Sequence, residues 1–295
     1  MASGAATALV ARLYRFALRA AACLPLGAAF RVARALGRLR YALRRRSAHM
    51  HPQLSAALDG SPADRRRWQR RAFELSAVED LEFFLMRRLG ASKVPRLVEV
   101  RGVEHLAAAL RGGRGAVLYS GHIHSHHAAF AALRMLGYPL NVVGYPPVFG
   151  STQAEVDFQR RRHELLEREF GCRFLYMQSG DFAVAVRAAH ALRRNEVVAL
   201  LIDKTVSPHT VEAAFLGGRQ PFPVGPALLA QSTGAAMIDF YAHRDRRWFP
   251  LVVELGRSHL AGDDVQAAMA ECASRLERHI RRHPAEWYML LDVPS

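Results

Sequence analysis

Short apolar runs alternate with longer amphipathic segments along most of this 295-residue chain. The runs are roughly four to six residues long, and segments of roughly 10 to 18 residues with helical periodicity separate them. The clearest runs are Gly115–Ser120, Leu140–Val143, Arg173–Met177 and Val197–Ile202. Such alternation is typical of strands that align in parallel beneath covering helices. The sequence therefore predicts an α/β fold with a mostly parallel or mixed central sheet covered by helices.

Helix caps and glycines place several other elements. Ser61-Pro62-Ala63-Asp64 is a strong helix start, and this helix is expected to run to Leu89 and stop at Gly90. Further expected elements are a strand at Val211–Phe215, a helix at Gly225–Thr233 and a last strand at Trp287–Leu291. No linker or repeat is visible, so we expect a basic helical segment at residues 1–58 and a single α/β domain at residues 59–295.

Positive charge is concentrated at the N-terminus. The formal net charge is +15, and ten arginines precede the first acid, Asp59. Two arginine trios repeat the spacing i, i+3, i+7, which places each trio on one face of a helix. They are Arg12, Arg15 and Arg19, then Arg31, Arg34 and Arg38, with Pro25 and Gly27 separating the two helices. This pattern favours a helical hairpin that lies on an anionic membrane surface.

The same N-terminal segment allows two alternatives. Its helices could instead pack on the domain, or the segment could be a targeting peptide. The uncharged run Ala20–Phe30 has only eleven residues, fewer than the roughly 20 that a membrane span needs. No recognised motif or aromatic-basic interleaving accompanies the charge, so we expect no nucleic-acid partner. The separate cysteines Cys23, Cys172 and Cys272 indicate a reducing compartment.

A histidine cluster directly follows the predicted strand Gly115–Ser120. Residues 122–127 contain four of the 14 histidines, at the sheet edge where α/β proteins bind ligands. The cluster predicts a general base, because histidine accepts protons near neutral pH. The alternatives are a metal site at His122, His124 and His126, which would make the protein a metal-dependent hydrolase, and a polar surface turn. No glycine-rich phosphate loop and no GxSxG motif is present, so no serine-hydrolase nucleophile is visible.

Several blocks stand in a characteristic order and spacing. They are Val100–Leu106, Gly115–His122, Leu201–Asp203, Phe215–Gly218, Pro223–Ala230 and Pro284–Met289. Together they resemble the lauroyl/myristoyl acyltransferases of late lipid A biosynthesis. These enzymes belong to the glycerolipid and lysophospholipid acyltransferase superfamily, whose hallmark is a His separated by four residues from an Asp or Glu, HX4D/E. The resemblance covers most of the chain and implies a glycerolipid acyltransferase-like fold.

The resemblance also implies a reaction. His122 would deprotonate a hydroxyl or amine of a membrane lipid or glycolipid, which attacks an acyl thioester on acyl carrier protein or CoA. An acidic carrier protein suits this basic surface best. Neither a cofactor nor a metal is expected. The implied location is the cytoplasmic face of the bacterial inner membrane, with peripheral or monotopic attachment.

The chain departs from the family motif at its acid. His127 occupies the Asp or Glu position of HX4D/E; it could accept a hydrogen bond from His122 but cannot offset an imidazolium charge. Asp203 is the first candidate for the substitute acid. Without one, the chain is a catalytically impaired relative that binds lipid or acyl carrier protein without turnover.

The remaining candidates concern substrate binding. Tyr145 stands where lipid A enzymes tend to carry an arginine, which puts lipid A itself in doubt as the acceptor. Arg162 and Arg168 are candidates for an acceptor phosphate, with a solvated helix face as the alternative. The helix start at Gly225 could offer backbone N–H groups to an anion or oxyanion. We expect the acids Glu79, Asp80 and Glu82 to counter arginines such as Arg87.

Overall fold

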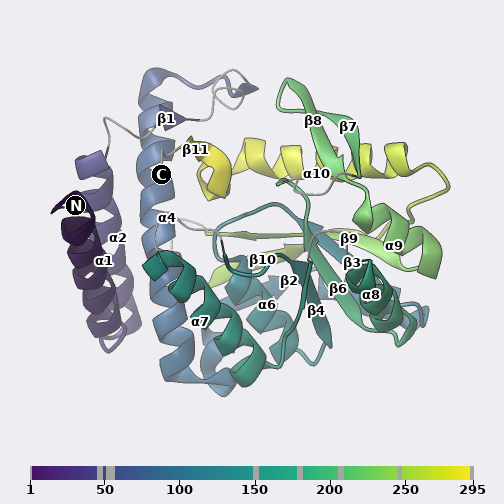
Figure 1. The fold of residues 1–295 in the computed structure, drawn as a ribbon, viewed down its shortest axis with the longest axis horizontal. Coiled ribbons are helices and arrows are strands. Elements are labelled where there is room, and N and C mark those ends of the chain that lie inside the picture. The colour runs from purple at the N-terminus through teal and green to yellow at the C-terminus, as the bar shows by residue number, and fades with distance from the viewer. Residues whose placement is uncertain are drawn as a thin grey trace.

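A computed structural model describes residues 2–44, 49–50, 57–148, 153–177, 182–204, 209–244 and 248–292. A seven-stranded sheet forms the centre of the fold, and helices flank it (Figure 1). The strands lie in the order β2-β10-β9-β3-β6-β4-β5. Their bounds are β2 Val98–Arg101, β3 Ala116–Ser120, β4 Leu140–Gly144, β5 Arg173–Tyr176, β6 Val197–Leu201, β9 Ala236–His243 and β10 Leu251–Leu255.

The sheet is mixed. Strands β9, β3, β6, β4 and β5 are parallel to one another, whereas β10 is antiparallel to β9. Strand β2 pairs with β10 in parallel. The expected α/β fold is confirmed. Every residue of β3 is buried, as expected for a strand that helices cover on both faces.

The helices confirm most of the expected boundaries. They are α1 Ala2–Ala21, α2 Leu26–Arg44, α4 Pro62–Leu89, α5 Val103–Arg111, α6 His126–Met135, α7 Gln153–Phe170, α8 Ala183–Arg193, α9 Gly225–Thr233 and α10 Val265–Arg282. The described residues also form the short 3₁₀ helices η1 Ala91–Arg96, η2 Pro284–Glu286 and η3 Tyr288–Leu290. Helix α4 begins with the expected cap, because Ser61 and Asp64 exchange both hydrogen bonds of a capping box.

One further strand prediction is confirmed, and another is wrong. Residues Val211–Phe215 lie in β7 (Thr210–Phe215), which pairs with β8 (Gly218–Pro223) as a separate hairpin outside the central sheet. The expected strand Trp287–Leu291 is wrong over most of its length, because Tyr288–Leu290 forms a 3₁₀ turn. Trp287 makes an isolated antiparallel bridge with Ile123, and β11, Leu291–Asp292, pairs with β1, His49–Met50. The Trp287 side chain reaches Asp203 by a hydrogen bond, and this tertiary contact outweighs the β propensity of its aromatic neighbours.

The N-terminal helices lie against α4 (Figure 1). Arg34 Nε donates to Glu74 Oε2 at 3.2 Å, and Arg38 Nε donates to Glu74 Oε1 at 2.7 Å. A Cβ added at Gly37 would lie 2.6 Å from the Glu74 Cα atom, so α2 and α4 approach closely there. Two arginines of the second trio therefore face α4. The boundary at residue 58 stays a prediction.

The outer face of α1 is apolar. Leu9, Val10, Leu13 and Phe16 are each more than half exposed, and Phe16 is 71% exposed. Among the helices of the described residues, none combines the length and hydropathy that crossing a bilayer requires.

Candidate active site

His122 and Asp203 meet at the carboxyl edge of the sheet. Strands β3 and β6 are parallel, with Ser120 opposite Leu201, so the residues that follow them lie side by side. The Nδ1 atom of His122 lies 2.6 Å from Oδ1 of Asp203. The backbone N–H of His122 donates to Oδ2 of the same carboxylate at 2.8 Å. Asp203, the first candidate for the substitute acid, thus lies in direct contact with His122.

Close packing around residue 121, between β3 and His122, requires a glycine there. A Cβ at Gly121 would lie 3.0 Å from Asp203 Oδ2 and 2.9 Å from the Leu276 side chain. Both contacts are tighter than ordinary van der Waals separation. A larger residue would therefore push the carboxylate away from His122.

The Asp203 carboxylate is buried but well satisfied. Trp287 Nε1 donates to its Oδ2 at 2.7 Å, beside the two bonds from His122. Burial alone would raise the pKa of Asp203, yet the His122 ring and these hydrogen bonds outweigh it and hold the pKa below its usual value. The carboxylate is therefore ionised at neutral pH.

The imidazole of His122 keeps its second nitrogen open. Its side chain is 31% exposed, whereas that of Asp203 is fully buried. When Nδ1–H donates to Asp203, the lone pair of Nε2 is left to accept a proton. Within the described ranges of the chain, no hydrogen bond or ion pair engages Nε2 of His122. A histidine that a carboxylate holds in one tautomer in this way is chemically able to accept a proton at Nε2.

Two other histidines of the cluster, His124 and His127, contact α4. His124 Nδ1 lies 3.0 Å from Glu79 Oε2, and His127 Nδ1 lies 3.4 Å from Glu79 Oε1. Arg162 Nη1 also lies 3.5 Å from Glu79 Oε1. Burial alone would raise the pKa of Glu79, but these partners hold it well below its usual value. Glu79 is thus an ionised carboxylate at the centre of a buried polar network.

The expected contact between His127 and His122 is not made. His127 lies in the first turn of α6, which directs its ring toward Glu79 on α4 and beside the His126 ring. Burial lowers the pKa of His127 well below its usual value and that of His126 to about 4. Both imidazoles are therefore neutral near pH 7, and neither offsets a charge on His122.

The three imidazoles of the alternative metal site do not converge. His122 turns to Asp203, His124 to Glu79, and His126 donates from Nδ1 to the carbonyl oxygen of Ile123 at 2.9 Å. A different group, Glu79, His126 and His127, brings its ligand atoms within 4.8 Å of one another. Its carboxylate is already engaged by His124, His127 and Arg162, so a cation there would displace neutralising partners and meet a guanidinium.

The predicted substrate-binding residues are only partly brought together. Arg162 is buried and pairs with Asp80 as well as Glu79, so its guanidinium is used inside the protein. Arg168 is exposed near the end of α7 that leads to the amino end of β5, the sheet edge opposite His122. Tyr145 follows β4 at the same edge as His122. Gly225 begins α9, with open space where a Cβ would lie.

Sequence reasoning missed the roles of Trp287 and the acids of α4. Glu79 and Asp80 face His124, His127 and Arg162, and Glu82 pairs with the buried Arg244, instead of countering Arg87. The signal that could have found these acids is their position: they fall in the most apolar stretch of α4, where an unpaired carboxylate is costly.

The fold and the site define an α/β protein with a carboxylate-oriented histidine at the carboxyl edge of its sheet. A sequence profile of the bacterial lipid A biosynthesis acyltransferase family matches residues 5–292, so the chain belongs to this family. The resemblance inferred from the sequence blocks is thereby confirmed.

Two similar enzymes are mycobacterial. The phosphatidylinositol mannoside acyltransferase of Mycobacterium tuberculosis is 28% identical over 221 residues, which cover 71% of this chain and 64% of that protein. The enzyme of the same name from Mycolicibacterium smegmatis is 30% identical over 233 residues, which cover 76% of this chain and 67% of that protein. The chain thus aligns with less than two thirds of the length of the M. tuberculosis relative.

Proposed function

We propose that this protein transfers a fatty acyl chain from an acyl thioester to a hydroxyl or amine of a lipid or glycolipid, with His122 as the general base. The observation that carries the proposal is the pairing of His122 Nδ1 with the buried Asp203 at 2.6 Å. The names of the relatives support the acyl transfer and a glycolipid acceptor.

The reaction follows from this geometry. His122 Nε2 takes the proton of the acceptor group as its oxygen or nitrogen attacks the thioester carbonyl. The tetrahedral intermediate then expels the thiolate, and the His122 imidazolium returns the proton to it, giving an ester or amide and a free thiol. Asp203 stabilises the imidazolium in between. The backbone N–H groups at Gly225 and the side chain of Tyr145 are the proposed contacts for substrate.

We further propose that α1 rests on the cytoplasmic face of the bacterial inner membrane. Exposed apolar residues on one helix face, with Arg12 and Arg19 exposed beside them, form the pattern of an interfacial helix. The basic surface also suits acyl carrier protein, whose acidic surface would be attracted to it, as the donor.

The test is mass spectrometry of lipids after incubation with purified protein and thioesters of acyl carrier protein and CoA. Wild type should add one acyl chain to one lipid class, whereas His122→Ala should add none. Asp203→Asn should lose a factor of about 10⁴ in kcat, as in related triads. The exposed Asp263→Asn is the matched control and should keep full activity.

A second candidate is the impaired relative that binds lipid or acyl carrier protein without turnover. The observation that favours it is His127, which leaves the HX4D/E position without an acid. Absence of product from wild type across a broad acceptor panel, with carrier-protein binding retained, would establish this candidate and overturn the first.

A further inference from the structure

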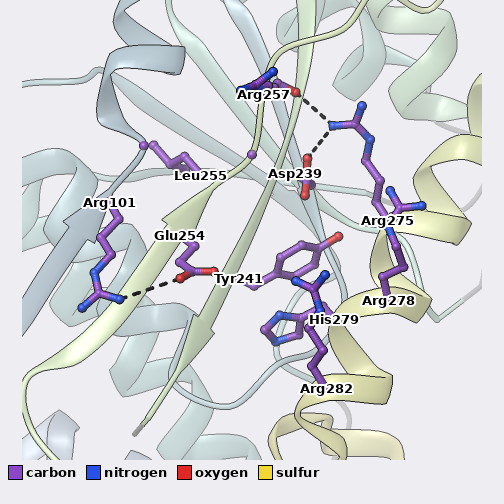
Figure 2. A pocket seen from close by; sticks show the side chains of 12 residues that line it. Arg101, Asp239, Tyr241, Glu254, Leu255, Arg257, Arg275, Arg278, His279 and Arg282 are labelled. Carbon is purple, nitrogen blue, oxygen red and sulfur yellow. Dashed lines mark hydrogen bonds and ion pairs between the residues drawn. The ribbon is translucent and has the colours of Figure 1, made fainter.

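A cavity of about 640 Å³ lies between α10 and the strands β2, β9 and β10. This volume is in the range of about 300–1,000 Å³ that is usual for ligand sites. Most of its charged lining is positive, as Figure 2 shows. The lining carries the guanidinium groups of Arg101, Arg257, Arg275, Arg278 and Arg282 and the carboxylates of Asp239 and Glu254. We call this cavity the arginine pocket.

The carboxylates of the lining neutralise only some of its arginines. Arg275 is held by Asp239 at 2.9 Å, Glu271 at 2.7 Å and the carbonyl oxygen of Arg257 at 2.9 Å. Arg257 and Arg282 have no acidic partner among the described residues, and both are exposed. They come from opposite walls, since Arg257 follows β10 and Arg282 ends α10. The arginine pocket therefore offers unneutralised positive charge from two sides.

Two buried polar atoms of the lining also lack a partner. The hydroxyl of Tyr241 and Nε2 of His279 make no hydrogen bond with any described residue, although each residue is only 6% exposed. Their rings stack with centroids 4.2 Å apart, and the Tyr241 hydroxyl points toward the helix that carries Arg275 and Arg278 (Figure 2). Leaving a buried polar atom unpaired costs free energy, so these atoms indicate a ligand that forms hydrogen bonds, to which the Tyr241 hydroxyl can donate.

We propose that the arginine pocket binds a ligand bearing two or more phosphate groups. Guanidinium forks match phosphate oxygens, and the Tyr241 hydroxyl adds a neutral donor. One phosphate would not span arginines on two walls of a cavity this large. The ligand could be the nucleotide end of a CoA thioester or a polyphosphorylated lipid headgroup; both present the same chemistry.

The arginine pocket is separate from His122 but shares α10 with it. Leu276 packs against Gly121 beside His122, while Arg275, Arg278 and His279 line the arginine pocket on another face of the same helix. The two sites therefore lie against different faces of α10. Phosphate binding in the arginine pocket does not depend on turnover at His122.

The experiment is equilibrium titration of the full chain with inorganic pyrophosphate at low ionic strength. Arg257→Ala combined with Arg282→Ala should weaken binding by about a hundredfold, at roughly tenfold for each charged hydrogen bond. Tyr241→Phe should weaken it by about tenfold while keeping the ring stack. Arg31→Ala combined with Arg161→Ala removes two exposed arginines elsewhere and should leave affinity unchanged.

Parallel titrations identify the source of the phosphates. Tighter binding of CoA than of CoA lacking its 3′-phosphate would assign the arginine pocket to the nucleotide end of a thioester donor. Competition by vesicles containing a bisphosphorylated inositol lipid, without binding of CoA, would assign it to a lipid headgroup. No pyrophosphate binding by wild type, or equal loss in the pocket and control pairs, would overturn the proposal. Tyr241→Phe removes only one oxygen atom and so tests the site even if the double arginine variant misfolds. An unchanged pyrophosphate affinity of Tyr241→Phe would contradict the proposal.

Discussion

At the scale of single residues, the carboxylate beside His122 comes from a neighbouring strand instead of the next helix turn. Asp203 follows β6 and receives hydrogen bonds from His122 and Trp287. The acid position of the family motif, which four residues separate from His122, is His127 here and belongs to a different network around Glu79. The two networks have separate carboxylates, so they should respond differently to substitution.

Introducing the acid of the family motif at position 127 should therefore destabilise the folded protein. His127→Asp places a carboxylate beside the buried Glu79 and removes a hydrogen-bond partner of Glu79. We expect the free energy of unfolding to fall by roughly 3 kcal/mol, as when one partner of a buried charge pair is lost. Acyl transfer should not increase. Urea unfolding and a turnover assay measure both effects; a gain in activity would instead indicate that position 127 serves His122.

The stabilisation by Asp203 should depend on pH. Its pKa is held below the usual value in the folded protein, so its contribution is present above the unfolded-state pKa of about 3.9. That contribution is lost as the pH falls through the lower folded-state pKa. The difference in unfolding free energy between wild type and Asp203→Asn should therefore shrink below about pH 4. Urea titrations at several pH values test this, with Asp263→Asn showing no such trend; a pH-independent difference would contradict it.

The histidine cluster after an apolar strand pointed to His122, and the family resemblance of the block Leu201–Asp203 pointed to Asp203. The structure adds that β3 and β6 are parallel neighbours, which brings the two residues together. It could not locate Trp287 on Asp203, since 84 residues separate the two and no periodicity links them. The same holds for Glu79 and His124, which are 45 residues apart. Contacts of this kind depend on how helices dock, which a local pattern does not encode.

At the scale of elements, local signals were strongest where caps and apolar runs agreed. Helix α4 has its predicted cap and stop, and β3 and β6 fall on the predicted runs. Strand β8 was missed because Pro221 and Pro223 weaken its strand signal; it is stable as one side of a two-stranded hairpin, where edge prolines are tolerated. The position of this hairpin outside the central sheet depends on tertiary packing, which a local sequence pattern does not encode.

The close approach of α2 and α4 should make two glycines of α2 respond in opposite ways. A Cβ at Gly37 would meet the backbone of Phe73 and Glu74 at 2.6 Å, whereas Gly27 has open space. Gly37→Ala should lower the free energy of unfolding by about 1–3 kcal/mol because the helices must separate. Gly27→Ala should raise it by roughly 0.5–1 kcal/mol through helix propensity. Chemical denaturation measures both; equal effects would show that α2 does not dock on α4 as described.

The outer face of α1 should determine membrane binding. Leu13 and Phe16 are 59% and 71% exposed, so Leu13→Asp combined with Phe16→Asp leaves the core intact. Each lost apolar contact should weaken vesicle binding by roughly tenfold. Leu260→Asp, at a residue 74% exposed elsewhere, is the matched control. Vesicle sedimentation compares the variants, and similar losses in both would remove α1 from the proposed membrane contact.

At the scale of the whole molecule, charge and apolar surface should contribute separately to membrane binding. The net charge of +15 attracts anionic lipid over distances that salt controls, because the Debye length shrinks from about 10 Å at 0.1 M to about 3 Å at 1 M. Each arginine near the surface contributes about 1 kcal/mol of this attraction. Affinity for anionic vesicles should therefore fall by at least about tenfold between 0.1 M and 1 M salt.

Apolar insertion of α1 should persist under the same conditions. Burial of Leu13 and Phe16 does not depend on counterions, so weak binding to neutral vesicles should change little with salt. The Leu13→Asp and Phe16→Asp pair should abolish this salt-resistant part while leaving much of the salt-sensitive part. Sedimentation with neutral and anionic vesicles across the salt series separates the two contributions. If the affinity for anionic vesicles does not change with salt concentration, the excess arginines do not bind the membrane and instead serve another partner. The arginine pocket would then be the first candidate site for that partner.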